Sequence, residues 1–356
     1  MVTSLEEKYM ERAIELASLA SGNTRPNPLV GAVIVYDDRI IGEGYHTRAG
    51  ESHAEVNAID SVRDKDLLKK ATMYVNLEPC SHYGRTPPCA TRIIEEKIPM
   101  VVIGSIDPSP NVGGKGINML IESGVEVKTG ILVNENRELN KRFFTYHEKR
   151  RPYVILKWAQ SADGYIDRVR VKDQKGPNWI TGVEERVLVH KWRSEEDAIL
   201  VGDKTALNDD PALDVRLWSG TNPRRFVLSD SGNLPHSLKM FRGESPAIIF
   251  SPRPQGEGGE EEFISLTGRE TALDEIMSYM YEEEIQSVII EGGYEVLSQF
   301  IDAGLWDEAR VFTGLIVFGT GLKAPVIKGK ETSYKNFRES RLEYIKPLNE
   351  TDRGEI

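Results

Sequence analysis

The chain has 356 residues, a length typical of two or three domains. Its 45 lysines and arginines against 56 aspartates and glutamates give a net charge of −11, which argues against a protein that mainly grips nucleic-acid backbone. No apolar run approaches the roughly 18 residues of a membrane helix, the start MVTSLEEKYM lacks a signal-peptide pattern, and two cysteines cannot form a disulfide scaffold. We therefore expect a soluble, cytoplasmic protein that binds neither nucleic acid nor membrane.

The first half of the chain alternates between helical and strand-like patterns. Residues 4–20 read as an amphipathic helix, because Ser4 and Glu7 form a capping box and apolar residues recur at helical spacing. Patterns at 29–36 and 39–45 predict a hairpin. The alternation that follows indicates βα units around a mostly parallel sheet. The further elements expected are helix 54–62, strand 72–77, helix 90–97, strand 100–105, helix 115–123, strand 125–128 and a polar helix from 134 to about 148.

Residues 149–152 (KRRP) are the best candidate for a domain boundary. A proline after a charged helix end stops the helix, and a new apolar strand starts at once. The economical division is therefore into domains at 1–148 and 149–356. The elements expected in the second domain are strands 153–159, 198–201, 225–228, 247–250, 287–290 and 308–313, and helices 183–193, 273–283 and 294–303.

The two cysteines of the chain follow a His-Ala-Glu motif in the first domain. His53 and Glu55 stand at the start of a predicted helix, and Cys80 and Cys89 follow a predicted strand. One imidazole and two thiolates make a three-ligand zinc set that leaves a fourth tetrahedral position open for water. Glu55 can point towards that water without ligating the metal and can carry its proton to a leaving amine. This pattern is typical of zinc-dependent base deaminases, although their cysteines are separated by two residues and these by eight.

Simpler roles for the same residues stay open at this point. Ser52 and Glu55 could form a capping box that only closes the helix start, and the cysteines could be inert buried thiols. A purely structural zinc would need a fourth protein ligand, which His82 could supply. The catalytic interpretation is favoured because both cysteines fall in one segment, directly after a Glu-Pro turn.

Three segments of the first domain resemble the bifunctional deaminase/reductase family of riboflavin biosynthesis. They are NPLVG at 27–31, HAE at 53–55 and LEPCSHYGRTPPC at 77–89. The resemblance implies a cytidine-deaminase-like domain with a mixed sheet, which hydrolyses the exocyclic amine of a diaminopyrimidine bearing a phosphoribosylamino group. It implies His53, Cys80 and Cys89 as zinc ligands, Glu55 as the proton carrier, and Asn27, His46, His82 and Arg85 as the lining of the pyrimidine and phosphate pocket.

The second domain lacks the Rossmann fingerprint, since no G-x-G-x-x-G follows a strand. The residues alone indicate an α/β domain that binds a nucleotide. Gly292 and Gly293 stand between a strand and a helix, where backbone amides can approach a phosphate. A plain tight turn is the alternative.

The family resemblance continues through this half to about Gly319. It rests on the pattern Lys157-x-x-x-Ser-x-Asp-Gly, on WIT at 179–181, on DDPAL at 209–213 with a following arginine, and on EGG at 291–293. It implies a dihydrofolate-reductase-like fold with a mostly parallel sheet that uses NADPH. The residues implied to contact the cofactor are Ala159, Trp179, Thr205, Asp209, Ser231 and Gly293, and those implied to hold the substrate are Arg193, Leu213, Arg216 and Glu291.

We therefore predict a bifunctional α/β enzyme with Zn²⁺ and NADPH as cofactors and a phosphorylated pyrimidine as substrate. Deamination comes first, and the ribosyl chain is then reduced to a ribityl chain. We expect a homo-oligomer. A zinc deaminase for a nucleoside or RNA base with an unrelated C-terminal nucleotide-binding domain is one alternative, which the −11 charge and 8% aromatic residues disfavour. A zinc-stabilised nucleotide-binding module without turnover is the other, and it predicts no ammonia release. We assign no role to the acidic segment 255–262.

Overall fold

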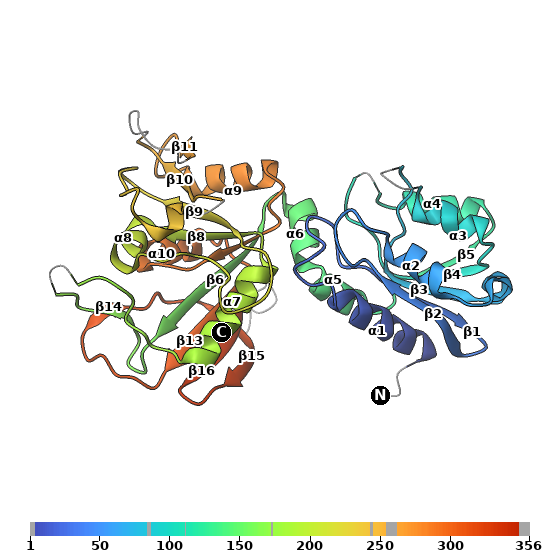
Figure 1. Cartoon of the computed structure of the whole chain (residues 1–356), viewed down its shortest axis with the longest axis horizontal. Helices are drawn as coiled ribbons and strands as arrows, with labels where there is room; N and C mark the ends of the chain where they lie inside the picture. The colour runs from blue at the N-terminus through green and yellow to red at the C-terminus, as the bar shows by residue number, and fades with distance from the viewer. Residues whose placement is uncertain are drawn as a thin grey trace. The chain divides into compact units, whose positions relative to one another are not determined.

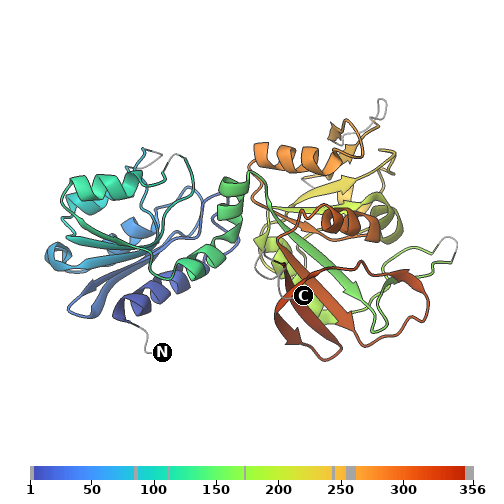
Figure 2. The same ribbon diagram turned by 180° about the vertical axis from the view of Figure 1, so that it is seen from behind.

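A computed structural model describes residues 4–83, 87–110, 112–171, 174–242, 245–253 and 262–348. Arg85 and nearly all of the acidic segment lie outside these ranges. The chain divides into two compact units, Met1–Arg150 and Arg151–Ile356. Figures 1 and 2 show the fold of each unit. None of the helices in the described ranges is long and apolar enough to span a membrane.

The first unit is built on a five-stranded mixed sheet with the order β2-β1-β3-β4-β5. β1 pairs antiparallel with both neighbours, whereas β3, β4 and β5 run parallel. The carboxyl ends of β3 and β4 therefore meet at one edge of the sheet. The strands are β1 Gly31–Tyr36, β2 Arg39–Tyr45, β3 Thr72–Leu77, β4 Met100–Ser105 and β5 Glu126–Thr129.

Helices cover both faces of this sheet (Figure 1). α1 packs on one face through Met10 and Ala13, which contact Val33 and Tyr74 in a shared core cluster. The opposite face carries α2, α3 and α4, whose apolar residues form a second core cluster with the strands. The helices of this unit are α1 Leu5–Ser18, α2 Ala54–Ser61, α3 Cys89–Glu95, α4 Lys115–Glu122, α5 Val133–Leu139 and α6 Lys141–Lys149, with a short 3₁₀ segment at Lys65–Lys70.

Two glycines let α2 lie close to the hairpin. A Cβ at Gly44 would stand 2.3 Å from the backbone nitrogen of Ala58, and one at Gly42 would stand 2.6 Å from the Ala58 carbonyl oxygen. No larger residue fits there without moving the helix. The close approach holds α2, whose N-cap is His53, against the hairpin.

The single helix predicted from residue 134 to about 148 is wrong, because the structure has two helices with a break at Asn140. The Asn140 side chain accepts from the backbone nitrogen of Leu29 at 2.8 Å and donates to its carbonyl oxygen at 2.9 Å. The backbone of Asn140 departs from the helical conformation, with φ −103° and ψ 25°, while its side chain holds the distant loop at Leu29. A sequence pattern of helix-forming residues does not reveal such a partner.

The second unit contains a nine-stranded sheet with the order β11-β10-β9-β8-β12-β6-β13-β16-β15. All pairs from β11 to β13 are parallel, and β16 and β15 add an antiparallel edge. The strands of this sheet are β6 Tyr153–Gln160, β8 Ala198–Gly202, β9 Arg224–Leu228, β10 Ile248–Ser251, β11 Phe263–Ser265, β12 Ser287–Ile290, β13 Glu308–Gly314, β15 Gly329–Asn336 and β16 Ser340–Pro347.

Helices again lie on both faces of the sheet (Figure 2). α9 and α10 contribute Ile276 and Phe300 to the larger core cluster, while α7 packs Trp192 against Phe312 on the other side. The helices are α7 Val183–Glu195, α8 Asp203–Asp209, α9 Ala272–Glu282 and α10 Tyr294–Asp302, with a 3₁₀ turn at Lys239–Phe241 and a separate two-stranded sheet of β7 Tyr165–Arg168 and β14 Gly321–Lys323.

The sequence did not predict the hairpin of β15 and β16 or the helix α8. Seven of the eight residues of β15 are exposed, so the strand GKETSYKN has no apolar alternation to signal it. α8 has only seven residues, fewer than two full turns. In the structure, β16 joins the hairpin to the main sheet by pairing antiparallel with β13.

Candidate functional site

Three candidate metal ligands converge in the first unit. His53 caps α2, Cys80 follows β3, and Cys89 is the first residue of α3. The His53 Nδ1 atom lies 3.6 Å from Cys80 Sγ and 3.3 Å from Cys89 Sγ, and all three atoms lie within 4.8 Å of one another. Around tetrahedral zinc, a nitrogen and a sulfur ligand are about 3.6 Å apart. The three side chains therefore fit a zinc ion.

The pKa values of the two thiols are shifted in opposite directions. The pKa of Cys80 is lowered to about 4, chiefly because the Cys89 thiol hydrogen-bonds to it and also because His53 and the Cys89 backbone lie beside it. The hydrogen bond to Cys80, together with burial, raises the pKa of Cys89. His82 is exposed and does not belong to this group of ligands. Among the described residues, no fourth protein ligand is therefore gathered with the three, as an open catalytic site requires.

Glu55 lies in the first turn of α2, only 3% exposed, beside the three candidate ligands. Burial raises its pKa to about 7, with the neighbouring Cys80 adding to the effect. The capping box considered above does not form, because the N-cap of α2 is His53 rather than Ser52 and no side chain caps the helix. The Glu55 carboxyl group is thus available for chemistry.

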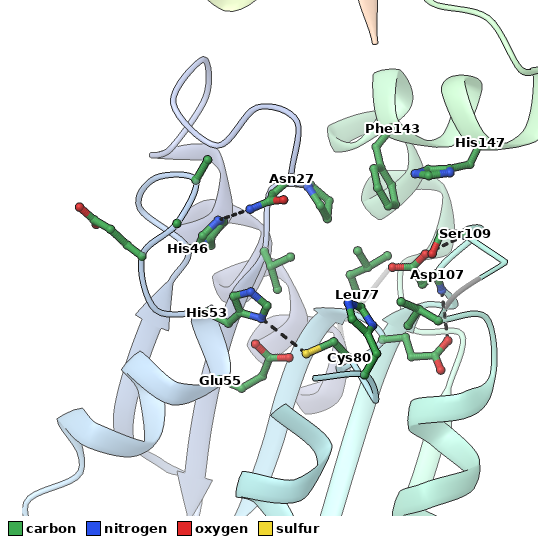
Figure 3. Close-up of a pocket in the computed structure, with 18 residues that line it drawn as sticks. Asn27, His46, His53, Glu55, Leu77, Cys80, Asp107, Ser109, Phe143 and His147 are labelled. Carbon is green, nitrogen blue, oxygen red and sulfur yellow. Dashed lines mark hydrogen bonds between the residues drawn. The ribbon is translucent and has the colours of Figure 1, made fainter. Parts of the chain in front are cut away.

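A cavity of about 650 Å³ opens in front of these residues (Figure 3). Asn27 and His46 form one wall, with 3.1 Å between Asn27 Nδ2 and His46 Nε2. His46 Nδ1 lies 3.1 Å from the Ser52 carbonyl oxygen, so Nδ1 carries the proton and Nε2 accepts from Asn27. Burial lowers the pKa of His46, which keeps the ring neutral. The residues predicted from the sequence that line this cavity are Asn27, His46, His53, Glu55, Cys80 and His82.

The opposite wall contains residues that the sequence reasoning missed. Asp107 and Ser109 follow β4, and Phe143 and His147 belong to α6. In Figure 3 these four side chains lie across the cavity from His53 and Asn27. The position of Asp107, just beyond a parallel strand adjacent to the one that precedes Cys80, was a usable signal, since such ends share one edge of the sheet. The sequence of α6 gave no comparable indication that this helix lines the cavity.

Glu78 joins the two walls of this cavity. Its buried carboxylate accepts from the backbone nitrogens of Gly114 at 2.9 Å and Gly116 at 3.0 Å, and from those of Asp107 and Ile117 at 3.3 Å. The carboxylate therefore caps the N-terminus of α4, although Glu78 is far from this helix in the sequence. Because Glu78 stands two residues before Cys80, the same interaction fixes the cysteine loop against the segment that carries Asp107.

The second unit contains two adjoining cavities, of about 280 and 690 Å³. The smaller lies at the glycine turn before α10 and is lined by Gly292 and Gly293. The larger lies between α7 and the segment that follows α8. The two share four lining residues, Pro177, Thr205, Asp209 and Glu291. Two ligands bound in these cavities would meet near Glu291.

Glu291 is the centre of a buried cluster of charges. Arg193 makes two hydrogen bonds with its carboxylate, at 2.9 and 2.8 Å, and Lys157 Nζ lies 3.8 Å away. The two cations lower the pKa of Glu291 to about 2 against the opposing effect of burial. Burial lowers the pKa of Lys157, partly offset by Glu291. Lys157 belongs to the resemblance motif but was not among the predicted site residues.

Some of the other residues predicted for this unit line one of the two cavities, and others line neither. Leu213 and Arg216 line the larger cavity, and so does Trp179, which is 55% exposed and stacks with Arg186. Asp209 forms an ion pair with Arg170 at 2.5 Å. Ala159 and Ser231 line neither cavity: Ala159 packs in the cluster around Trp192, and Ser231 is exposed.

Comparison with known proteins identifies the family. A model of the cytidine and deoxycytidylate deaminase zinc-binding region matches residues 3–105, and a model of the RibD C-terminal domain matches residues 152–347. The riboflavin biosynthesis protein RibD of Aquifex aeolicus is 39% identical over 329 residues, which cover 90% of each chain. This chain belongs to the RibD family. RibD of Escherichia coli is 35% identical over 333 residues, which cover 88% of this chain and 89% of that one.

Solved structures of RibD proteins support the same family assignment. The crystal structure of a diaminohydroxyphosphoribosylaminopyrimidine deaminase/5-amino-6-(5-phosphoribosylamino)uracil reductase from Thermotoga maritima is 38% identical, with a TM-score of 0.85 over 97% of this chain and 99% of that one. RibD of Acinetobacter baumannii is 32% identical, with a TM-score of 0.86. The chain is a bifunctional enzyme of riboflavin biosynthesis, with a zinc deaminase domain and an NADPH-dependent reductase domain, and it acts on a small pyrimidine. The predicted fold class, family and cofactors are confirmed.

Proposed function

We propose that the first domain releases ammonia from a diaminopyrimidine bearing a phosphoribosylamino group, and that the second domain then reduces the ribosyl chain to a ribityl chain. The observation that carries this proposal is the pairing, in one chain, of a cavity lined by His53, Glu55 and Cys80 with two adjoining cavities that share Glu291. The first arrangement suits hydrolysis of an amine, and the second suits transfer between two bound molecules. The alternative of an unrelated C-terminal domain is disfavoured by the RibD C-terminal match.

In the first domain we assign His53, Cys80 and Cys89 as ligands. Zinc, when bound there, supplies a water molecule that is acidic at neutral pH. Glu55 takes a proton from the attacking water, whose oxygen bonds to the amine-bearing ring carbon, and gives a proton to the amine, so that the C–N bond breaks and ammonia leaves. A carboxyl group whose pKa is near 7 can both accept and donate a proton at working pH.

We infer how this domain recognises its substrate from which atoms of the cavity wall donate hydrogen bonds and which accept them. Because His46 Nε2 accepts from the Asn27 amide nitrogen, the Asn27 carbonyl oxygen remains as an acceptor for a pyrimidine amino group. We assign His82 and Arg85 to the phosphate, since an imidazole N–H and a guanidinium group both donate hydrogen bonds to phosphate oxygens. His82 stands exposed at the cavity, and Arg85 belongs to the segment outside the described residues.

In the second domain the reaction breaks C1′–O4′, forms a C–H bond at C1′ and places a proton on O4′. NADPH, when bound, supplies the hydride. We assign the smaller cavity, with Thr205, Asp209 and Gly293, to the cofactor, and the larger one, with Leu213, Arg216 and Glu291, to the substrate. Lys157 lies next to Glu291 and lines the larger cavity, so we assign it as the proton donor to O4′. Arg193 holds the Glu291 carboxylate in place.

We also propose that the enzyme is a homo-oligomer that works in the cytoplasm. The chain's two cysteines are both free thiols that meet at the candidate metal site. Thiols persist in this state in a reducing compartment, which supports the location.

Purified protein should contain about one zinc ion per chain, bound by two thiolates and one imidazole. Elemental analysis measures the content. Removing zinc with a chelator should abolish ammonia release and leave reduction of the deaminated intermediate intact, because the three ligands lie in the first domain. Deamination that persists in metal-free protein would exclude the zinc mechanism.

Arg216→Ala should raise the KM for the ribosylamino phosphate by roughly 10- to 150-fold, because a charge-assisted phosphate contact contributes about 1.5–3 kcal/mol. The Kd for NADPH should stay nearly unchanged. Arg224→Ala, which removes a surface arginine that pairs with Glu283, serves as the control. Weakened NADPH binding with an unchanged KM for substrate would show that the two cavities are assigned the wrong way round.

A further inference from the structure

His190 is a buried histidine that the reaction described above does not use. It lies on α7, one turn before Arg193, and is only 4% exposed. Its ring lines the larger cavity of the second domain together with Arg193, Arg216 and Glu291. A buried polar ring at a substrate cavity needs a hydrogen-bond partner or a ligand.

The partner of this ring is the backbone of Arg216. The Arg216 backbone nitrogen donates to His190 Nδ1 at 3.2 Å. Burial, and the positive charges of Arg193 and Arg216, lower the pKa of His190 to about 4, so the ring is neutral at working pH. A neutral ring that accepts at Nδ1 carries its proton on Nε2. Nδ1 is therefore the acceptor of this hydrogen bond at working pH.

The segment that ends at Arg216 is held by side chains at three successive residues. Arg193 donates to the Asp214 carbonyl oxygen at 3.2 Å, Asn222 accepts from the Val215 nitrogen at 2.7 Å, and His190 accepts from the Arg216 nitrogen. The segment starts at Leu213, which is buried with a positive φ of 55°. An unusual backbone conformation at a ligand site persists only when its surroundings hold it.

The Arg216 side chain is only loosely held by its surroundings. It is 53% exposed, and its ion partner is Asp214, two residues away on the same segment. Because Asp214 is carried by the same segment, the backbone of this segment determines where the ion pair of Arg216 stands. Among the described residues, His190 is the side chain that fixes this backbone at Arg216 itself.

We propose that His190 is a positioning residue for substrate binding in the reductase site: by accepting the Arg216 N–H, it holds the Arg216 guanidinium where it meets the substrate phosphate. This inference rests on the proposed role of Arg216. It predicts that His190 affects the phosphate and acts only through Arg216. It leaves NADPH binding, which uses the other cavity, unaffected.

The test compares three substitutions of His190 and measures steady-state reduction of the deaminated intermediate. His190→Leu removes the acceptor and should raise KM about five- to tenfold with kcat within about twofold, the loss expected for one hydrogen bond. His190→Asn places a carbonyl oxygen near the former Nδ1 and should restore a KM close to that of the wild type. His190→Gln, whose amide extends past this point, should behave like leucine and replaces it if His190→Leu fails to fold.

A double-mutant cycle separates positioning from a merely structural role. On an Arg216→Ala background, His190→Leu should change KM by less than about twofold, because the group that it positions is gone. Substrate that lacks the phosphate should be insensitive to either substitution. An equal rise in KM on both backgrounds, or a rise for the phosphate-free substrate, would overturn the inference. If Arg216→Ala alone leaves KM unchanged, the phosphate assignment itself fails and the inference falls with it, whereas an effect of Arg216→Ala without one of His190→Leu removes the inference alone.

Discussion

Replacing Glu55 by glutamine should lower kcat for deamination by about 10² to 10⁴, the usual contribution of a positioned acid–base group. Glutamine keeps the size of the side chain and its place in the first turn of α2, but it can neither accept the proton of water nor protonate the leaving amine. Reduction of the deaminated intermediate should be nearly unchanged, because its cavities lie in the other compact unit. The two activities are followed separately as ammonia release and NADPH consumption.

The matched control for this variant is Glu11→Gln, an identical change on the exposed face of α1. It should leave both activities at the wild-type level. A Glu55→Gln enzyme that deaminates normally but unfolds at a lower temperature would show that Glu55 only stabilises the helix start. That outcome would contradict the assigned role, while the zinc measurement on the same protein would test the metal site independently.

The deaminase residues could be predicted because the chemically active side chains stand close together in two short segments of the sequence. His53 and Glu55 lie at the start of one helix, Cys80 lies in the loop after β3, and Cys89 begins the next helix, α3. Residue type and spacing together specify such a site. The far wall of the cavity is different, since Phe143 and His147 reach it only because α6 turns at Asn140. The Asn140 side chain makes two hydrogen bonds to Leu29 there, 111 residues away, which no local pattern shows.

The reductase residues show a second limit of sequence reasoning. A motif indicates that an arginine stands at a site, but it does not say which partner the arginine has. Arg193 and Arg216 both looked suited to a phosphate, yet Arg193 is buried and bound by two hydrogen bonds to Glu291, whereas Arg216 is half exposed. Burial and pairing separate the two roles, and both are properties of the folded chain. The relevance of Lys157 likewise depends on its distance to Glu291, 134 residues later in the sequence.

Replacing Lys157 by methionine should lower kcat for reduction by about 10² to 10⁴, because the proton that O4′ requires would lose its donor. Methionine has a similar length and is tolerated in buried surroundings. Ammonia release should be unaffected. Since burial lowers the pKa of Lys157, the wild-type kcat for reduction should fall with rising pH at a pH below the usual lysine value, and this limb of the profile should be absent from the methionine variant.

Lys157→Arg distinguishes proton donation from simple charge. Arginine keeps the positive charge beside Glu291 but does not release its proton at any working pH. If Lys157 donates the proton, the arginine variant should reduce the intermediate almost as slowly as the methionine variant while still binding it. If the arginine variant reduces at the wild-type rate, the cation only stabilises the Glu291 carboxylate, and the proton on O4′ comes from another source. Measuring KM and kcat separately for the two variants decides between these outcomes, because a lost charge contact raises KM and a lost proton donor lowers kcat.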